Sequence, residues 1–349
     1  MNSTPASISL DLQTIAEIDI YSQFQRQIVL APYTTWGVGG AAAFFLEPAT
    51  PLELVAAYHW AWQHQLPFVV IGKGSNILVD DQGINGVVVC MKNSMARFWQ
   101  DQQSSIFTAE AGCHLAKLAL AAARSEMAGF EFLICIPGTV GGAIAINAGV
   151  GGRDSNACIK SILLDVTVLN PDLLRSSATE RNGSNQAAQI SLTEFCDRAI
   201  VTIPASELDL SYRHSNLNQR HQWILSARFY SPQTASRADI LAQHRAILQK
   251  RVAKQPLNQR TSGSTFKQPT SNENNKPAGW YIDQAGLKGY QIGGASISAK
   301  HANWIENDGT ATAQDIKNLI AHVQQVVADR FDVQLEREVR FLPQDLITN

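Results

Sequence analysis

The segment from residue 136 to residue 149 reads IPGTVGGAIAINAG. Glycines recur through it and just beyond it, separated by small apolar residues, so its backbone amides have little side-chain bulk around them. A long, flat ligand could lie against such a segment. A glycine-rich packing turn within a sheet would have a similar composition, although a single turn needs fewer glycines. The glycines in question are Gly138, Gly141, Gly142, Gly149, Gly151 and Gly152.

A second glycine-rich segment, GKGSN at residues 72–76, follows the apolar run 68–71, which is predicted to be a buried strand. Its glycines would let backbone N–H groups approach an anion, and Ser75 and Asn76 could add hydrogen bonds. The alternative is a tight turn that positive φ angles permit. The segment matches neither the Rossmann fingerprint nor the P-loop, because Ile77 replaces the last glycine and Lys73 lies between the glycines.

Periodicity and capping residues predict a mixed series of helices and strands around these two segments. The strongest helix start is at Thr50, Pro51 and Glu53, where the threonine can cap, the proline fits the first turn and the glutamate can reach back. Helices are predicted at 51–65, 114–127, 236–254, 278–285 and 312–331, and strands at 68–71, 86–91, 105–111, 161–169, 224–230, around 265, 296–306 and 334–341.

The length of 349 residues exceeds what one hydrophobic core usually supports, so more than one domain is expected. Residues 1–30 are interpreted as a leader with a short amphipathic helix, and residues 176–189 as a mobile surface loop. Residues 31–233 hold both glycine-rich segments and are predicted to form the first domain. Residues 234–349 are predicted to form a compact α+β domain.

Composition and charge argue against several classes of protein. A formal charge of −2, with no basic run longer than residues 249–254, argues against a nucleic-acid partner. The first residues lack the blocks of a signal peptide and no apolar run reaches membrane-spanning length, so a cytoplasmic protein without membrane insertion is expected. The five cysteines form no C-x-x-C pair and the eight histidines show no paired metal spacing, so no metal site is expected.

Three further segments carry charged or hydroxyl side chains: SYRHS at 211–215, GSTFKQP at 263–269 and LEREVRF at 335–341. Each has an ordinary structural interpretation when taken alone. The serine can cap or turn the chain, and the charged residues can form a solvated sheet face or surface ion pairs. His301, in KHANW, is likewise interpreted as a structural hydrogen-bonding residue.

Taken together and in order, eight segments resemble the UDP-N-acetylenolpyruvoylglucosamine reductase (MurB) family. They are TTWGVGGAA, GKGSN, IPGTVGGAIAINAG, SYR, SGSTFKQP, AGWYIDQAGLKG, IGGASISAKHANW and LEREVRF, and they span about residues 30–342. The resemblance implies an α+β protein. Its FAD-binding part would contain two α/β subdomains, similar to vanillyl-alcohol-oxidase (PCMH-type) flavoproteins, and a C-terminal α+β substrate domain would follow.

The resemblance also implies a function. Members are UDP-N-acetylmuramate dehydrogenases, which use non-covalently bound FAD to pass a hydride from NADPH to the enolpyruvyl group of a UDP-sugar in peptidoglycan synthesis. Three residues map onto the family's catalytic positions: Arg213, Ser264 and Glu338. Arg213 would stabilise developing carboxylate charge with the help of Glu338, and Ser264 would protonate the substrate carbon. A monomer is expected.

By the same resemblance, the two glycine-rich segments hold FAD, and four side chains contact the UDP-sugar or the nicotinamide. The implied cofactor positions are Gly72, Lys73, Gly74, Ser75, Asn76, Pro137, Gly138, Thr139, Gly141, Gly142, Ala143, Asn147 and Gly149. The implied substrate positions are Tyr212, Lys254, Lys267 and Gln268.

The chain departs from the family pattern at several positions. Gln268 stands where a common form has asparagine, Gly151 replaces a tyrosine, and Asp283 replaces a glutamate. Residues 230–236 leave no room for the long tyrosine-bearing loop of one subclass, so the chain resembles the shorter-loop subclass. Two other functions are considered: a flavin oxidase of the same fold class, and a nonenzymatic nucleotide-binding regulator that needs only the glycine-rich loops.

Overall fold

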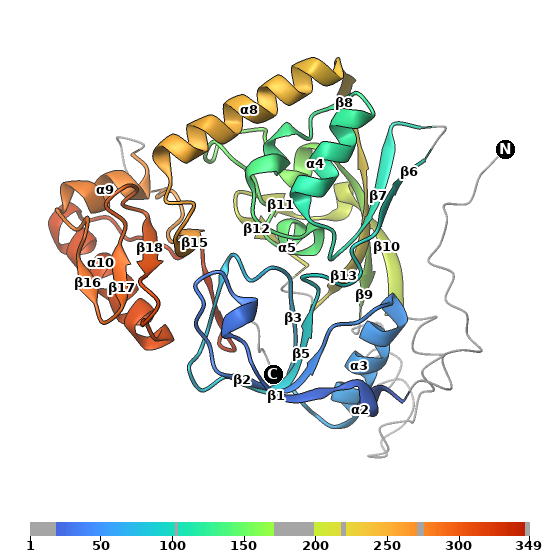
Figure 1. Ribbon diagram of the computed structural model, residues 1–349, viewed down its shortest axis with the longest axis horizontal. Helices are drawn as coiled ribbons and strands as arrows, with labels where there is room; N and C mark the ends of the chain where they lie inside the picture. Colours follow the sequence, from blue (N-terminus) through green and yellow to red (C-terminus); the bar gives the residue numbers. More distant parts are fainter. Residues whose placement is uncertain (1–18, 102–103, 171–198, 218–220, 271–275, 346–349) are drawn as a thin grey trace.

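The computed structural model describes residues 19–101, 104–170, 199–217, 221–270 and 276–345. The loop expected at 176–189 lies outside these residues. The described chain forms two adjoining sheet-based units and a third, C-terminal unit, with a long helix, α8, extending from the second unit to the C-terminal one (Figure 1). None of the helices in these ranges combines the length and the apolar character needed to cross a membrane.

The first sheet has four strands in the order β1-β2-β5-β3. Its strands are β1 (Gln25–Val29), β2 (Ala41–Leu46), β5 (Ile84–Cys90) and β3 (Phe68–Ile71), and helix α3 (Pro51–Gln63) connects β2 to β3. The strands β2, β5 and β3 are parallel. Val87 and Val89 of β5 enter one hydrophobic core and Val88 enters another, so this strand is buried on both faces and reads as a continuous apolar run.

Helix α3 begins as the sequence predicts. Thr50 accepts a hydrogen bond from the Glu53 backbone N–H at 3.2 Å, and Pro51 takes the first helical position. The Glu53 carboxylate reaches one residue further back than a capping box requires, and accepts from the Ala49 N–H at 2.6 Å. The cap is therefore confirmed, with the reciprocal bond shifted to the preceding residue.

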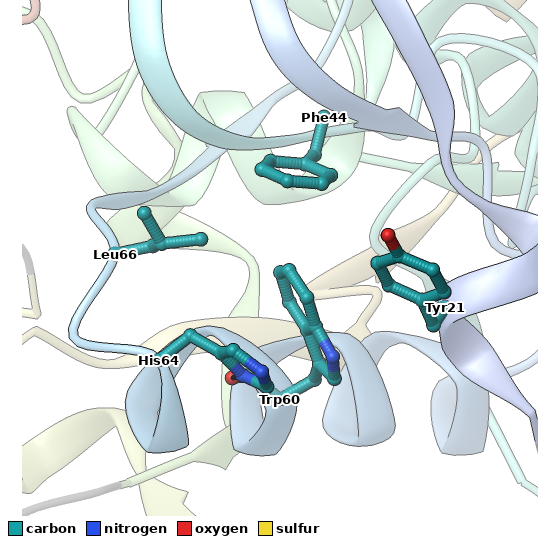
Figure 2. Close-up of a pocket in the computed structure, with 5 residues that line it drawn as sticks. All are labelled: Tyr21, Phe44, Trp60, His64 and Leu66. Carbon is teal, nitrogen blue, oxygen red and sulfur yellow. Dashed lines mark hydrogen bonds between the residues drawn. The ribbon is translucent and has the colours of Figure 1, made fainter.

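Aromatic residues attach the start of the described chain to the outer side of this unit (Figure 2). Helix α2 (Ile20–Gln23) brings Tyr21 to 5.6 Å from the ring of Trp60 on α3, and Trp60 also lies 5.0 Å from Phe44 and stacks on His64 at 4.1 Å. A shallow pocket remains between these rings and Leu66. Together with β1, the cluster shows that the folded unit begins before residue 30, inside the segment expected to be a leader.

The second sheet has five antiparallel strands in the order β10-β9-β13-β7-β6. The strands are β10 (Ile200–Pro204), β9 (Leu163–Leu169), β13 (Trp223–Tyr230), β7 (Ile106–Glu110) and β6 (Phe98–Gln100). Helices α4 (Leu115–Arg124) and α5 (Val140–Ala145) pack into the same core as this sheet, with the short helices η2 (Glu131–Cys135), η3 (Ile159–Ser161) and η4 (Ala205–Glu207) between strands. One core therefore joins the first two units.

Helix α8 (Arg237–Lys254) leads to the C-terminal unit (Figure 1). There, four antiparallel strands in the order β15-β18-β17-β16 pack with helices α9 (Ala278–Gln284) and α10 (Ala313–Phe331). The strands are β15 (Arg260–Ser264), β18 (Trp304–Asn307), β17 (Ala295–Ile297) and β16 (Gln291–Ile292). Trp36, Val38 and Leu78 of the first unit belong to the core of this one, so the units share apolar contacts.

Three short pairings complete the topology. β19 (Arg340–Leu342) runs parallel to β4 (Ile77–Val79), β8 (Met127–Ala128) pairs with β14 (Gln233–Thr234), and β11 (Leu210–Ser211) forms a hairpin with β12 (His214–Ser215). The β19 pairing returns the end of the chain to the first unit, directly after the GKGSN loop. A short helix, η1 (Ala31–Tyr33), follows β1.

Three element predictions need correction. The helix predicted at 114–127 ends at Arg124, because Glu126 takes a φ of 55° and Met127 starts a strand. The glycine-rich segment 136–149 contains the helix α5, which its low helix propensity concealed. The strand predicted at 334–341 forms only at residues 340–342, because its ladder partner is β4 of the first unit.

Candidate active site

A cavity of about 1100 Å³ lies where the three units meet. Its walls come from the loop after β3, from the segment around α5, from the β11–β12 hairpin, from the last turns of α8, and from the C-terminal unit with β19. Each wall contains one of the segments that the sequence singles out. The topology therefore brings these distant segments to one place.

The GKGSN loop is fixed by the segments that surround it. Gly74 has a φ of 67°, and a Cβ there would lie 2.1 Å from the Tyr33 carbonyl oxygen, so only glycine fits. The Ser75 hydroxyl donates to the Pro137 carbonyl oxygen, which ties the loop to the second glycine-rich segment. The side-chain amide of Asn76 donates to the Glu338 carbonyl oxygen at 3.1 Å. Ser75 and Asn76 thus use their side chains to hold the two neighbouring walls.

The α5 segment presents a bare backbone to the cavity. A Cβ at Gly138 or Gly142 would have no neighbour closer than 3.5 Å, so a side chain at either position would grow into the cavity. Thr139, at the start of α5, has a buried hydroxyl oxygen without a hydrogen-bond partner among the described residues. A flat ligand would fill the space beside Gly138 and Gly142.

Most of the cofactor positions implied by the resemblance line the cavity. Two do not. Gly141 faces the other way, where a Cβ would meet the Cβ of Ala111 at 3.0 Å. Asn147 is buried, and its side chain bonds to Ser211 and Lys160. The positions that do line the cavity are Gly72, Lys73, Gly74, Ser75, Asn76, Pro137, Gly138, Thr139, Gly142, Ala143 and Gly149.

Arg213, Ser264 and Glu338 all line the same cavity. The Arg213 guanidinium donates through Nε to Oε1 of Glu338 at 2.5 Å, and both side chains are largely buried. The Glu338 backbone N–H donates to the carbonyl oxygen of Thr265 at 2.8 Å, which places the glutamate beside the end of β15, where Ser264 lies. The Ser264 hydroxyl forms no hydrogen bond with any described residue and is available to a ligand.

Burial and ion pairing act in opposite directions on Glu338. Burial raises the pKa of the Glu338 carboxyl above its ordinary value, while the positive charge and hydrogen bond of Arg213, and then the charge of Lys267, lower it. Burial has the larger effect. The carboxylate is therefore strongly dependent on Arg213 for its charge.

Three of the four predicted substrate residues line the cavity, and one does not. Tyr212 lines the cavity, and the centre of its ring lies 4.7 Å from the Arg153 guanidinium carbon and 5.1 Å from that of Arg213. The Tyr212 hydroxyl accepts a hydrogen bond from the Gln268 backbone N–H at 3.3 Å. Gln268 and Lys254 also line the cavity, whereas Lys267 does not and pairs instead with Glu336.

The cavity wall also carries positive charges that the motif analysis did not assign to a site. Burial lowers the pKa of both Arg251 and Arg340, and neither guanidinium forms an ion pair within the described part of the chain. Only two acidic side chains line the cavity, Asp283 and Glu338. Such a wall suits a ligand with several negative charges. The unassigned cations are Lys250, Arg251, Lys288, Lys300 and Arg340.

The sequence contains a signal for two of these unassigned cations, Lys250 and Arg251. Residues 249–254 form the longest basic run, which is too short to predict a nucleic-acid surface. In the structure, the run ends α8, and its basic residues 250, 251 and 254 share the face that borders the cavity. His301 also lines the cavity. Burial lowers its pKa, and its Nδ1 accepts from the Asn303 N–H at 3.3 Å, so it has the hydrogen-bonding role expected of it.

Two family models match successive parts of the chain. Residues 42–172 match the family model described as "FAD binding domain", and residues 255–342 match "UDP-N-acetylenolpyruvoylglucosamine reductase, C-terminal domain". The crystal structure of the UDP-N-acetylenolpyruvylglucosamine reductase (MurB) from Thermus caldophilus is similar, with a TM-score of 0.66 and 27% identity, over 92% of this chain and 100% of that one. The fold class expected from the resemblance is confirmed.

Curated relatives cover nearly the whole chain. The UDP-N-acetylenolpyruvoylglucosamine reductase of Synechococcus sp. (strain RCC307) is 38% identical over 93% of this chain and 95% of its own length. That of Acaryochloris marina is 36% identical over 92% and 93%. With both family segments in place and a cavity built from the family's motifs, the chain belongs to the UDP-N-acetylenolpyruvoylglucosamine reductase (MurB) family of FAD-dependent oxidoreductases.

Proposed function

We propose that the protein reduces the enolpyruvyl group of UDP-N-acetyl-3-O-(1-carboxyvinyl)glucosamine to give UDP-N-acetylmuramate, with NADPH as hydride donor, in peptidoglycan synthesis. The observation that carries this proposal is the buried Arg213–Glu338 pair, in one cavity with the free hydroxyl of Ser264. Because the substrates are NADPH and a UDP-activated sugar, the proposal includes a cytoplasmic location.

The cavity fits FAD on its own geometry. Gly138 and Gly142 leave the space that a flat ring system would fill, and the GKGSN loop and the α5 segment border it together. Lys73 and the unpaired cations Arg251 and Arg340 would compensate the negative charge of a diphosphate. Bound there, FAD would supply the hydride-transfer chemistry that connects a reduced nicotinamide to the substrate carbon.

Arg213 supplies the charge that the reaction needs. Hydride addition to the terminal carbon of an enolpyruvyl group leaves negative charge on the adjacent carbon and its carboxylate. Arginine is always protonated and can contact a carboxylate through two donors, so its guanidinium stabilises this charge. Glu338 holds Nε of Arg213, which leaves the other guanidinium nitrogens for the substrate. The pair is thus oriented before the substrate arrives.

Ser264 is the proposed proton donor. Its hydroxyl has no protein partner among the described residues, and it lies at the end of β15, beside the segment that carries Glu338. Serine is a weak acid, but a carbanion stabilised only by its carboxylate is a strong base, so the transfer is feasible. Tyr212, Gln268 and Lys254 line the same cavity and are the proposed contacts to the UDP-sugar or the nicotinamide.

One assay separates this function from the alternatives. The purified protein is incubated with NADPH, with and without the enolpyruvyl UDP-sugar, and NADPH consumption and formation of UDP-N-acetylmuramate are followed. The proposal expects a yellow protein and consumption that depends on the sugar. A colourless protein would favour a nucleotide-binding regulator, and a yellow protein that oxidises an alcohol with oxygen but ignores the sugar would favour an oxidase.

A further inference from the structure

The β11–β12 hairpin holds Tyr212 and Arg213 in its two-residue loop. Arg213 has a φ of 54°, a left-handed conformation that costs a residue with a side chain about 1 kcal/mol. Each strand of the hairpin has only two residues, and so short a ladder does not stabilise a strained loop by itself. Contacts from outside the hairpin must therefore hold Arg213 in place.

Asn147 makes one of these contacts. Its side-chain amide Nδ2 donates to the Ser211 carbonyl oxygen at 2.8 Å, two residues before Arg213. Its Oδ1 accepts from the Lys160 backbone N–H at 2.9 Å. The two partners fix the orientation of the amide, because a backbone N–H can only donate and a carbonyl oxygen can only accept. Asn147 is 4% exposed, so both bonds are shielded from water.

Lys160 makes the second contact. Its ammonium group donates to the Leu210 carbonyl oxygen at 3.1 Å, next to the carbonyl that Asn147 binds. The first strand of the hairpin is therefore held at two successive carbonyls, and Asn147 links both anchors through the Lys160 backbone. On the other side, Asn147 follows α5, whose residues Gly142 and Ala143 line the cavity. The anchor thus joins the cofactor wall to the Arg213 hairpin.

We infer that Asn147 is a positioning residue for Arg213, and that Lys160 assists it by holding the neighbouring carbonyl. The inference rests on the proposed function of Arg213. It gives Asn147 a role different from the cofactor contact that the family resemblance implies, because its side chain is satisfied by Ser211 and Lys160 and lies outside the cavity lining.

The test measures the two half-reactions separately, by the absorbance of the flavin. Asn147→Asp keeps the size, the tolerance of a left-handed backbone and the acceptor for Lys160, but it cannot donate to Ser211. We expect normal flavin content and reduction by NADPH within about 3-fold of wild type. Reoxidation by the enolpyruvyl sugar should slow by about 100-fold, the scale of a displacement of about 1 Å in a catalytic group.

A double-mutant cycle shows whether the effect passes through Arg213. In an Arg213→Lys background, where the guanidinium is already lost, Asn147→Asp should slow reoxidation by less than about 3-fold further, because residues that act as a unit are not additive. Lys160→Met removes only the second anchor and should slow reoxidation in the wild-type background. Lys160→Arg, which retains a donor, should restore most of the rate.

Each outcome decides the inference. Full additivity of Asn147→Asp with Arg213→Lys would overturn it, and so would loss of flavin from Asn147→Asp with reoxidation unchanged in the molecules that retain it. If Asn147→Asp does not fold, the Lys160→Met and Lys160→Arg pair decides in its place. A wild-type flavin that the enolpyruvyl sugar does not reoxidise would instead reject the proposed function.

Discussion

At the scale of single residues, Ser264 is expected to act in the reduction of the substrate and not in the binding of flavin. Its hydroxyl has no described partner, so removing it leaves no buried group unsatisfied. We predict that Ser264→Ala retains flavin and its reduction by NADPH, while reduction of the enolpyruvyl sugar slows by about 100-fold or more, the usual scale for positioned proton transfer. Stopped-flow absorbance of the flavin measures both steps. An equal loss in both would remove Ser264 from the proton-transfer step.

Glu338 gives a second prediction at this scale, on stability. Burial raises the pKa of Glu338, so the folded protein holds this proton more tightly than the unfolded chain does. The protonated Glu338 carboxyl therefore contributes to the free energy of unfolding below the ordinary glutamate pKa of about 4.3, and this contribution is lost as the pH rises through the raised pKa. Glu338→Gln is neutral throughout. We therefore expect the variant to gain stability relative to wild type as the pH rises across this window.

Urea unfolding of the flavin-free proteins at a series of pH values measures this difference. The matched control is Glu336→Gln, because Glu336 is exposed, pairs with Lys267 and lies outside the cavity lining. The control should show no such trend. A stability difference between Glu338→Gln and wild type that stays constant with pH would show that Arg213 cancels the effect of burial at this carboxyl, and a difference that shifts in favour of wild type as the pH rises would show that Arg213 outweighs it.

At the scale of elements, α5 offers two adjacent glycines that face opposite ways. Gly142 faces the cavity, where a Cβ would meet nothing closer than 3.5 Å, whereas Gly141 faces Ala111 at 3.0 Å. Gly142→Leu should weaken flavin binding by about 10-fold or more with little loss of stability, since overfilling a packed site costs about 1–3 kcal/mol. Gly141→Leu should destabilise the flavin-free protein by a similar amount.

Flavin titration and thermal unfolding of the flavin-free variants distinguish the two effects. The pair shares one helix and one substitution, so differences in helix propensity cancel. If both variants lost flavin equally and unfolded equally, the opposite orientation of the two glycines would not determine their roles.

Local signals in the sequence predicted the longer helices and several of the buried strands correctly. The helix α3 has a cap and a proline in its first turn, α10 has a full capping box at Thr312 and Asp315, and β3 is an apolar run ended by glycine. The elements that were missed depend on distant partners. β19 forms because β4, more than two hundred and fifty residues earlier, offers a parallel edge, and no local pattern reports that edge.

In the candidate site, too, the sequence identified residues within motifs but not features that depend on contacts between distant segments. Family motifs identified Arg213, Ser264 and Glu338, and the structure places all three in the cavity. The motifs did not distinguish Gly142, which lines the cavity, from Gly141, which packs against Ala111 just after β7, because both are glycines in one turn of helix. The motifs also did not show that Arg340 forms no ion pair with any described residue, since pairing depends on which carboxylates lie nearby in the fold.

At the scale of the whole molecule, the C-terminal unit supplies one wall of the cavity and is docked on the first unit by several contacts. Besides the β19–β4 pairing, Trp36 donates through its indole N–H to the Ile305 carbonyl oxygen at 2.9 Å, and Asp80 pairs with Lys317 of α10. Asp81 accepts from the first backbone N–H groups of α10, those of Ala313 at 2.8 Å and Gln314 at 3.0 Å. A carboxylate of one unit therefore caps a helix of the other.

This docking contact gives a prediction for substrate binding. Asp81→Ala should lower the free energy of unfolding by about 1 kcal/mol, the usual effect of losing a helix cap. If the weaker docking of the C-terminal unit reduces substrate binding by a similar free energy, the KM for the enolpyruvyl sugar should rise by a factor of about 5. Flavin affinity should change little, because the glycine-rich segments belong to the first two units. Steady-state kinetics and flavin titration measure the two quantities.

Asp315→Ala is the matched control, because Asp315 caps the same helix from within the C-terminal unit, through the Thr312 N–H at 2.9 Å. Losing it should cost α10 a similar stability while leaving the contact between the units intact, so its KM should match wild type. The comparison therefore distinguishes a loss of helix stability from a loss of the contact between the two units. If both variants raised KM equally, the stability of α10 itself, and not its attachment through Asp81, would govern how the substrate wall is held.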